Sequence, residues 1–111
     1  MFANTLIIRA DASVAIGTGH VMRCLALAQA WQDAGGSIVF AMAESTPAID
    51  ARLRAECMEI VHLTSPNNHQ DSGEVIALAS DRGARWVVVD GYRFNSAYQR
   101  NFKNAGLKLL F

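Results

Sequence analysis

The sequence predicts an α/β domain of three layers, built around a parallel sheet of about five strands. Two observations lead to this prediction. Apolar runs such as Leu6-Ile7-Ile8 are continuous rather than alternating, which is typical of strands buried on both faces. Segments with apolar residues at helical spacing separate these runs, so strands and helices alternate along the chain. This alternation implies right-handed crossovers and helices on both faces of the sheet.

The expected elements follow from this alternation in chain order. Each strand should end where polar residues or glycine begin, and each helix should end near a glycine or a turn. The expected strands span residues 5–10, 37–42, 59–63, 86–89 and 107–111. The expected helices span residues 19–34 and 47–56, then from 71 or 72 to 81, and from 95 or 96 to 104.

Local signals support these boundaries. Gly35-Gly36 should stop the first helix with a left-handed cap, and Pro47 suits the first turn of the second. The side chains expected to cap the other three helices are Ser45 or Thr46, Asp71 or Ser72, and Asn95 or Ser96. Trp31 and Trp86 fall on apolar faces, so we expect both rings in the core.

Composition excludes several classes of function. The 111 residues suit one domain, and 51% of them are hydrophobic, which disfavours disorder. The net charge is zero and no basic cluster occurs, which argues against binding nucleic acid or an anionic membrane. No signal peptide or membrane span is recognisable, so we expect a soluble cytoplasmic protein. Because the last expected strand reaches Phe111, we expect one domain of a longer protein.

Isolated thiols and imidazoles suggest no metal centre. Cys24 and Cys57 lack a metal-type spacing, and two cysteines are too few for a disulfide framework, so we expect reduced thiols. His62 and His69 have no partner at zinc-ligand spacing, and we expect structural or solvent-exposed roles for both.

The loop from Asp11 to His20 carries the main functional signal. A strand leads into a loop with Gly17 and Gly19, and a helix starts there, which favours an anion site because the first helical N–H groups lack internal partners. His20 lies at that helix end, where a neutral imidazole can act as a general base. Arg23 shares its face at a spacing of three residues.

Nearby residues leave alternatives open. Met22 replaces the third glycine of the dinucleotide fingerprint, and the P-loop pattern is absent, which disfavours those two ligand classes. Asp11 either orients the imidazole of His20 or caps the loop through its own backbone. Arg9 is either a phosphate contact or a surface charge, and Arg23 either contacts phosphate or pairs with Asp11.

The carboxyl ends of the strands should gather the polar groups of a ligand site. The 11–20 loop, residues 44–46 after the second strand and residues 90–93 after the fourth all fall at that edge. Tyr92 is placed there for contact with a ligand.

The run from Arg9 to Ala28, with Gly17-x-Gly19-His20 at its centre, resembles the N-terminal motif of the PseG-type UDP-sugar hydrolases of pseudaminic acid biosynthesis. Val88-Val89-Asp90-x-Tyr92 is similar to that family's second motif. More distantly, Gly-x-Gly-His resembles the N-terminal loop of MurG-like enzymes with the glycosyltransferase-B fold.

The resemblance implies that residues 1–111 form the Rossmann-like N-terminal half of a glycosyltransferase-B fold, without the C-terminal domain that holds most of the UDP. It implies hydrolysis of UDP-2,4-diacetamido-2,4,6-trideoxy-β-L-altropyranose with inversion at the anomeric carbon and with no metal or other cofactor. His20 would be the base, and the substrate would contact Asp11, Gly17, Gly19, Arg23 and Tyr92. Alternatives are a glycosyltransferase of the same fold and a module that binds a nucleotide-sugar without turnover.

Overall fold

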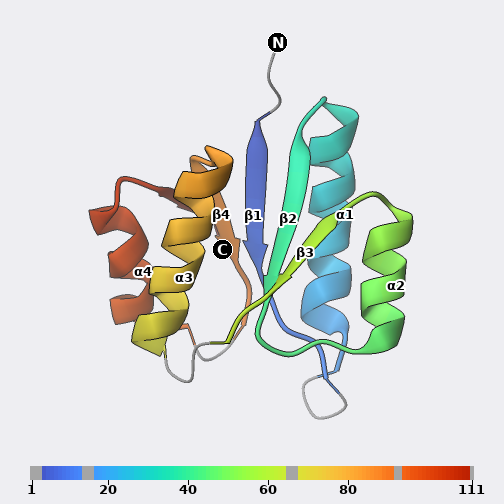
Figure 1. Cartoon of the computed structure of the whole chain (residues 1–111), viewed down its shortest axis with the longest axis horizontal. Helices are drawn as coiled ribbons and strands as arrows, with labels where there is room; N and C mark the ends of the chain where they lie inside the picture. The colour runs from blue at the N-terminus through green and yellow to red at the C-terminus, as the bar shows by residue number, and fades with distance from the viewer. Residues whose placement is uncertain (1–3, 14–16, 65–67, 92–93, 111) are drawn as a thin grey trace.

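The computed structural model describes residues 4–13, 17–64, 68–91 and 94–110 (Figure 1). Strands and helices alternate as the sequence predicts. The strands are β1 (Thr5–Arg9), β2 (Ser37–Met42), β3 (Glu59–His62), β4 (Trp86–Val89) and β5 (Lys108–Leu110). The helices are α1 (Gly19–Asp33), α2 (Pro47–Ala55), α3 (Asn68–Arg82) and α4 (Ser96–Asn104). Most ends coincide with the predicted ones and most of the others differ by one residue, but α3 begins at least three residues earlier than predicted.

The five strands form one parallel sheet in the order β3-β2-β1-β4-β5, which confirms the predicted fold class. Helices α1 and α2 cover one face of the sheet, and α3 and α4 cover the other (Figure 1). Strand order reverses beside β1, whose two neighbours are β2 and β4. In parallel sheets of this kind the carboxyl ends of such strands border the ligand crevice.

Two hydrophobic cores lie on the two faces of the sheet. Leu6 and Ile8 of β1 point toward α1 and α2, whereas Ile7 points toward α3 and α4. All three are at most 2% exposed, so β1 is buried on both faces as its continuous apolar run predicts. The rigid centre of the sheet therefore holds the loop that follows β1.

Helix ends follow the predicted chemistry with one exception. Thr46 caps α2 by accepting from the N–H of Ile49, and Asn95 caps α4 by accepting from the N–H of Tyr98. The prediction that Asp71 or Ser72 caps α3 is wrong, because α3 already begins at Asn68 and both side chains are 1% exposed. Asp71 is held inside by buried partners, which are described below.

The glycine pair after α1 has two separate roles. Gly35 adopts a φ of 94° and its N–H donates to the carbonyl of Gln32, while the N–H of Gly36 donates to that of Trp31. A Cβ on Gly36 would lie 2.2 Å from Nε1 of Trp31, so only glycine leaves room for this ring. The predicted left-handed stop is confirmed, and it also fixes the position of Trp31.

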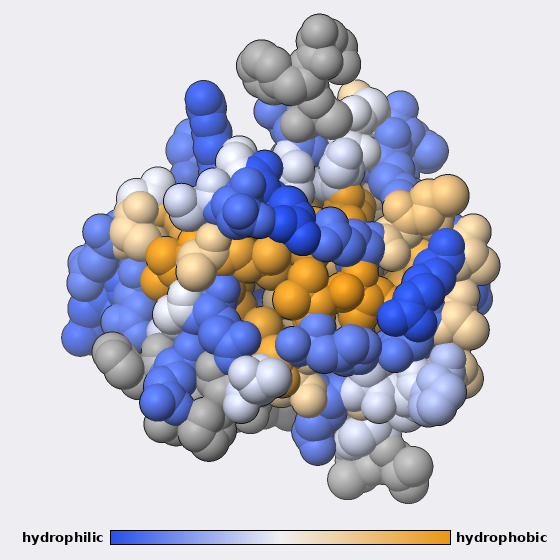
Figure 2. Space-filling view, in the orientation of Figure 1, coloured by the Kyte–Doolittle hydropathy of each residue, from blue (hydrophilic) through white to orange (hydrophobic). Residues whose placement is uncertain are grey.

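Apolar side chains are exposed at the β3 edge of the sheet and at the start of β4. Figure 2 shows hydrophobic side chains across the face where β3 forms the sheet edge, surrounded by hydrophilic ones. At β4, Trp86 is 37% exposed, so its expected burial in the core is wrong. No helix in the described ranges is long and apolar enough to cross a membrane.

Candidate active site at the carboxyl ends of β1 and β4

The predicted base, His20, lies at the point where the strand order of the sheet reverses. It is the second residue of α1, directly after the loop that leaves β1. Asp90 is the first residue after β4, and its N–H donates to the carbonyl of Arg9 at 3.0 Å, which extends the pairing of β4 with β1. The backbone therefore brings residues 70 positions apart to one edge of the sheet.

A short hydrogen bond joins these two side chains. Nδ1 of His20 lies 2.8 Å from Oδ1 of Asp90, and the side chains are 13% and 16% exposed. A carboxylate can only accept, so the bond to Asp90 requires a proton on Nδ1. Nη2 of Arg23, which can only donate, also lies 3.0 Å from Nδ1, so the two contacts favour opposite tautomers of a neutral ring. In the tautomer with its proton on Nδ1, the lone pair lies on Nε2, and Asp90 stabilises positive charge on the ring after it accepts a proton.

Arg23 completes a cluster of charges on the same carboxylate. Its Nε donates to Oδ2 of Asp90 at 2.9 Å and its Nη2 donates to Oδ1 at 2.6 Å, a bidentate pair. The guanidinium remains 67% exposed. The structure thus pairs Arg23 with Asp90 rather than with Asp11, and leaves its positive charge at the rim of the site.

The thiol of Cys24 makes a further contact with the carboxylate of Asp90. Its buried Sγ lies 3.5 Å from Oδ2 of Asp90 and donates to it. Burial, together with the negative charge of Asp90, raises the pKa of this thiol to about 12. Burial also raises the pKa of Asp90, but hydrogen bonds from Arg23, His20 and Cys24 outweigh burial and hold it below its ordinary value. Asp90 is therefore ionised at neutral pH.

The backbone around His20 suits a ligand with negative charge. The side chain of Thr18, the residue before α1, makes no capping hydrogen bond, in contrast to the caps of α2 and α4. Gly17 adopts a φ of 82° and donates its N–H to the carbonyl of Ser13 at 2.7 Å, which closes the loop. A Cβ on Gly19 would meet nothing within 4 Å, so this glycine borders open space rather than packed atoms.

A second cluster of charges lies behind the first and is closed to solvent. Arg9 is 0% exposed and donates to Asp71 through Nε at 2.9 Å and through Nη2 at 2.6 Å. It also donates to Asp11 through Nη1 at 2.6 Å, and the hydroxyl of Tyr98 donates to Asp71 at 2.6 Å. Both alternatives considered for Arg9, a phosphate contact and a surface charge, are therefore wrong.

Asp11 connects this buried cluster to the neighbouring loop. It accepts from the N–H of Ala43 at 2.8 Å and from that of Glu44 at 3.2 Å, so it caps the loop after β2 rather than its own. The carboxylate that orients the imidazole of His20 is therefore that of Asp90 and not that of Asp11. Tyr92, the remaining predicted contact, lies outside the described residues.

Sequence reasoning placed Asp90 at this edge but did not single it out. Its position directly after a buried strand adjacent to β1 is the signal that identifies it. Cys24 follows His20 by four residues and therefore shares its helix face, which the sequence also shows. Elsewhere, His62 is 51% exposed and lies 3.3 Å from Asp50, as its expected surface role implies. The side chain of His69 is outside the described part, and within that part no group of three side chains is arranged to hold a metal ion.

Comparison with solved structures gives the fold. No protein-family model matches the sequence, and no curated protein matches it. A glycosyltransferase from Rickettsia africae ESF-5 matches 96% of this chain with a TM-score of 0.73 and 14% identity, and the match covers 28% of that chain. Acinetobacter baumannii MurG matches 96% of this chain with a TM-score of 0.68 and 15% identity, and the match covers 34% of MurG.

The same architecture occurs in a protein of another kind. A universal stress protein family member from Burkholderia pseudomallei matches 96% of this chain with a TM-score of 0.58 and 16% identity, and here the match covers 93% of that chain. The present chain thus spans about a third of the Rickettsia glycosyltransferase and of MurG, but nearly all of the stress protein. It shares a Rossmann-like fold with these proteins, and its chemistry has to be argued from its own site.

Proposed function

We propose that this chain is the N-terminal half of a nucleotide-sugar enzyme, a UDP-sugar hydrolase in which His20 is the general base. The bond between Nδ1 of His20 and Asp90 carries the proposal, because the tautomer that donates to Asp90 has its lone pair on Nε2, as a base requires, at the edge where ligands bind. A carboxylate that orients a histidine without itself becoming protonated is a recurrent arrangement in catalysis.

The proposed reaction needs one base and support for a departing anion. Nε2 of His20 takes a proton from water while the water oxygen bonds to the anomeric carbon, and the bond from that carbon to the diphosphate oxygen breaks. UDP leaves as an anion, so a strong general acid is not required. The positive charge of Arg23 and the N-terminus of α1 favour negative charge at this edge.

A glycosyltransferase is the second candidate, since one of the matching structures is a glycosyltransferase. In that enzyme the same base would remove a proton from an acceptor hydroxyl instead of from water. The complete protein that carries this chain would be incubated with the UDP-sugar in ¹⁸O-labelled water, without an acceptor. UDP release with ¹⁸O on the anomeric carbon supports the hydrolase, and turnover only after an acceptor is added supports the transferase. No turnover in either case would leave only a binding module.

Substitution of His20 tests the role of the base. His20→Ala should lower kcat by roughly 10²–10⁴-fold with little change in substrate affinity, the usual contribution of a general base. His62→Ala is the matched control, because this imidazole is exposed and pairs with Asp50 away from the site. Equal kcat in His20→Ala and His62→Ala would refute the assignment. Asp90→Asn should lower kcat less than His20→Ala and shift the pH profile of kcat, as expected for a positioning residue.

A further inference from the structure

Two side chains compete for one nitrogen of the proposed base. Nδ1 of His20 lies 2.8 Å from Oδ1 of Asp90 and 3.0 Å from Nη2 of Arg23, and this Nη2 lies 2.6 Å from the same Oδ1. Asp90 needs a proton on Nδ1, whereas the guanidinium can only donate and needs a lone pair there. A neutral imidazole cannot meet both demands. In this position Arg23 therefore opposes the tautomer that has its lone pair on Nε2.

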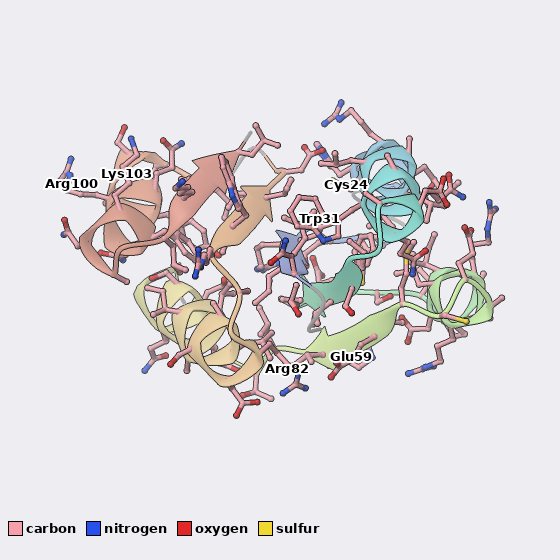
Figure 3. All side chains as sticks on the ribbon, turned by 90° about the horizontal axis from the view of Figure 1, so that it is seen from above. Cys24, Trp31, Glu59, Arg82, Arg100 and Lys103 are labelled. Carbon is pink, nitrogen blue, oxygen red and sulfur yellow. The ribbon has the colours of Figure 1, made fainter. Side chains whose placement is uncertain are left out.

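Among the donors to Asp90, Arg23 has the most room to move. Its side chain is 67% exposed, whereas those of His20 and Asp90 are 13% and 16% exposed. Figure 3 shows Cys24 on the side of α1 that faces the sheet, where it is packed in the core. When Arg23 turns toward solvent, Asp90 keeps its contacts with His20 and Cys24. The site can thus lose the contact with Arg23 without leaving the carboxylate unpartnered.

The contact between Arg23 and Asp90 has a geometry that also suits a phosphate group. Nε donates to Oδ2 at 2.9 Å and Nη2 donates to Oδ1 at 2.6 Å, so two N–H groups face two oxygens of one acceptor. Arginine binds phosphate oxygens in the same bidentate way. A diphosphate carries more negative charge than one carboxylate, and the N-terminus of α1, about one turn from Arg23, favours anions. A diphosphate at this end of α1 can therefore compete with Asp90 for the guanidinium.

We propose that Arg23 is a positioning residue that keeps His20 from adopting the tautomer of a base until the diphosphate of the ligand draws the guanidinium away. Nε2 then releases its proton to solvent and Nδ1 takes one from solvent, so the change of tautomer needs no other reactant. Nδ1 donates to Asp90, and the lone pair on Nε2 is ready to accept a proton from water. This role rests on the proposed function, in which a diphosphate is the leaving group. It confines the active base to molecules that have the leaving group in place.

Nuclear magnetic resonance of the imidazole nitrogens tests the ligand-free state. The complete protein that carries this chain would be labelled with ¹⁵N-histidine, and the signals of His20 would be assigned by their loss in His20→Ala. Spectra would be recorded at about pH 9, where an ordinary imidazole is neutral and its ¹⁵N shifts report which nitrogen carries the proton. Arg23→Met removes the competing donor. We expect it to move the Nδ1 resonance toward the protonated position and the Nε2 resonance toward the unprotonated one.

A second arginine that pairs with carboxylates provides the matched control. Arg82, the last residue of α3, pairs with Glu59 and Asp81. Figure 3 shows Arg82 and Glu59 on the other side of the sheet from α1. Arg82→Met should leave the His20 resonances where they are in the unchanged protein. Equal resonances in Arg23→Met and the unchanged protein, or the same movement in Arg82→Met, would overturn the proposal.

Inorganic pyrophosphate then tests the coupling to the ligand. Added to the unchanged protein until calorimetry shows saturation, it should move both His20 resonances toward their positions in Arg23→Met. In Arg23→Met it should bind at least about tenfold more weakly and move neither resonance further. Absence of binding, binding that leaves the resonances in place, or an equal movement in Arg23→Met would overturn the proposal. The ¹⁸O experiment judges the hydrolase separately, because a protein that hydrolyses the UDP-sugar without these movements would lose only the role given to Arg23.

Discussion

The two charge clusters at the carboxyl end of the sheet differ in their relation to solvent. The buried cluster of Arg9, Asp71, Asp11 and Tyr98 is at most 7% exposed in any member. In the open cluster, Asp90 receives bonds from His20 and Cys24 as well as from Arg23, which is 67% exposed. A charge group closed to solvent can act only on the protein that surrounds it, whereas an open one can also act on a ligand. The buried cluster is therefore expected to contribute to stability, and the open cluster is the one for which we propose chemistry.

Neutralising each arginine should give the sharpest contrast. Arg9→Met leaves the carboxylates of Asp71 and Asp11 buried without their cation, and removal of one partner of a buried pair costs about 3–5 kcal/mol. Arg23→Gln should cost less than about 1 kcal/mol, because the side chain that it removes is 67% exposed. Urea unfolding of both variants measures the two free energies.

A compensated variant separates charge from packing in the buried cluster. Arg9→Met combined with Asp71→Leu and Tyr98→Phe removes the guanidinium together with the Asp71 carboxylate and its Tyr98 donor. Asp11 then keeps the backbone N–H groups that it already accepts from, so the combined variant should recover part of the stability lost by Arg9→Met alone. The proposed division between the clusters would fail if Arg9→Met destabilised the protein no more than Arg23→Gln does.

Removing a single hydroxyl from the buried cluster should have an intermediate effect. Tyr98→Phe deletes the donor to Asp71 and keeps the ring that packs between Phe94 and Phe102. Burial and the hydrogen bond to Asp71 raise the pKa of Tyr98, so the native hydroxyl is protonated and donates. Loss of a hydrogen bond to a charged group costs about 1.5–3 kcal/mol. An unfolding free energy within error of the unchanged chain would show that Asp71 is satisfied without it.

The sequence predicted the sheet, its helices and the position of His20 because each depends on local patterns. Continuous apolar runs identified β1 and β4, and the Gly-rich loop identified the start of α1. The partners of Arg9 could not be predicted, because Asp71 lies 62 residues away and its position mimics that of a helix cap. A charged residue in a sequence is expected at the protein surface. Only the folded structure shows that Arg9 is buried.

The expected core position of Trp86 failed for a related reason. Its strand is apolar throughout, but burial of the ring depends on a helix over β4 and β5, and the described residues contain none there. Asp90 shows the opposite case. The sequence placed it at the correct edge, and only the geometry of its three donors showed that it organises the site.

Acid titration should reveal the pKa of Asp90 in the open cluster. Its folded-state pKa is below the ordinary 3.8, because hydrogen bonds from its donors outweigh burial. The stabilising contribution is therefore present above about pH 4 and is lost as pH falls through the folded-state value. The difference in unfolding free energy between the unchanged chain and Asp90→Asn should thus shrink between pH 7 and pH 3. A difference that stays constant with pH would show that ionisation of Asp90 contributes nothing.

The smallest expected change in unfolding free energy concerns Cys57, which belongs to neither charge cluster. Cys57 follows α2 with a φ of 62°, and the bonds from its N–H to Arg54 and from Met58 to Leu53 form the same helix stop that Gly35 makes after α1. A side chain in this left-handed conformation costs about 1 kcal/mol, so Cys57→Gly should raise the unfolding free energy by about 0.5–1 kcal/mol. Gly35→Ala is the reciprocal change and should lower it by a similar amount, with neither variant altering kcat. If Cys57→Gly lowered the unfolding free energy, the thiol would make a stabilising contact that outweighs the backbone strain. Differences of about 1 kcal/mol between such variants could then not be attributed to the backbone alone.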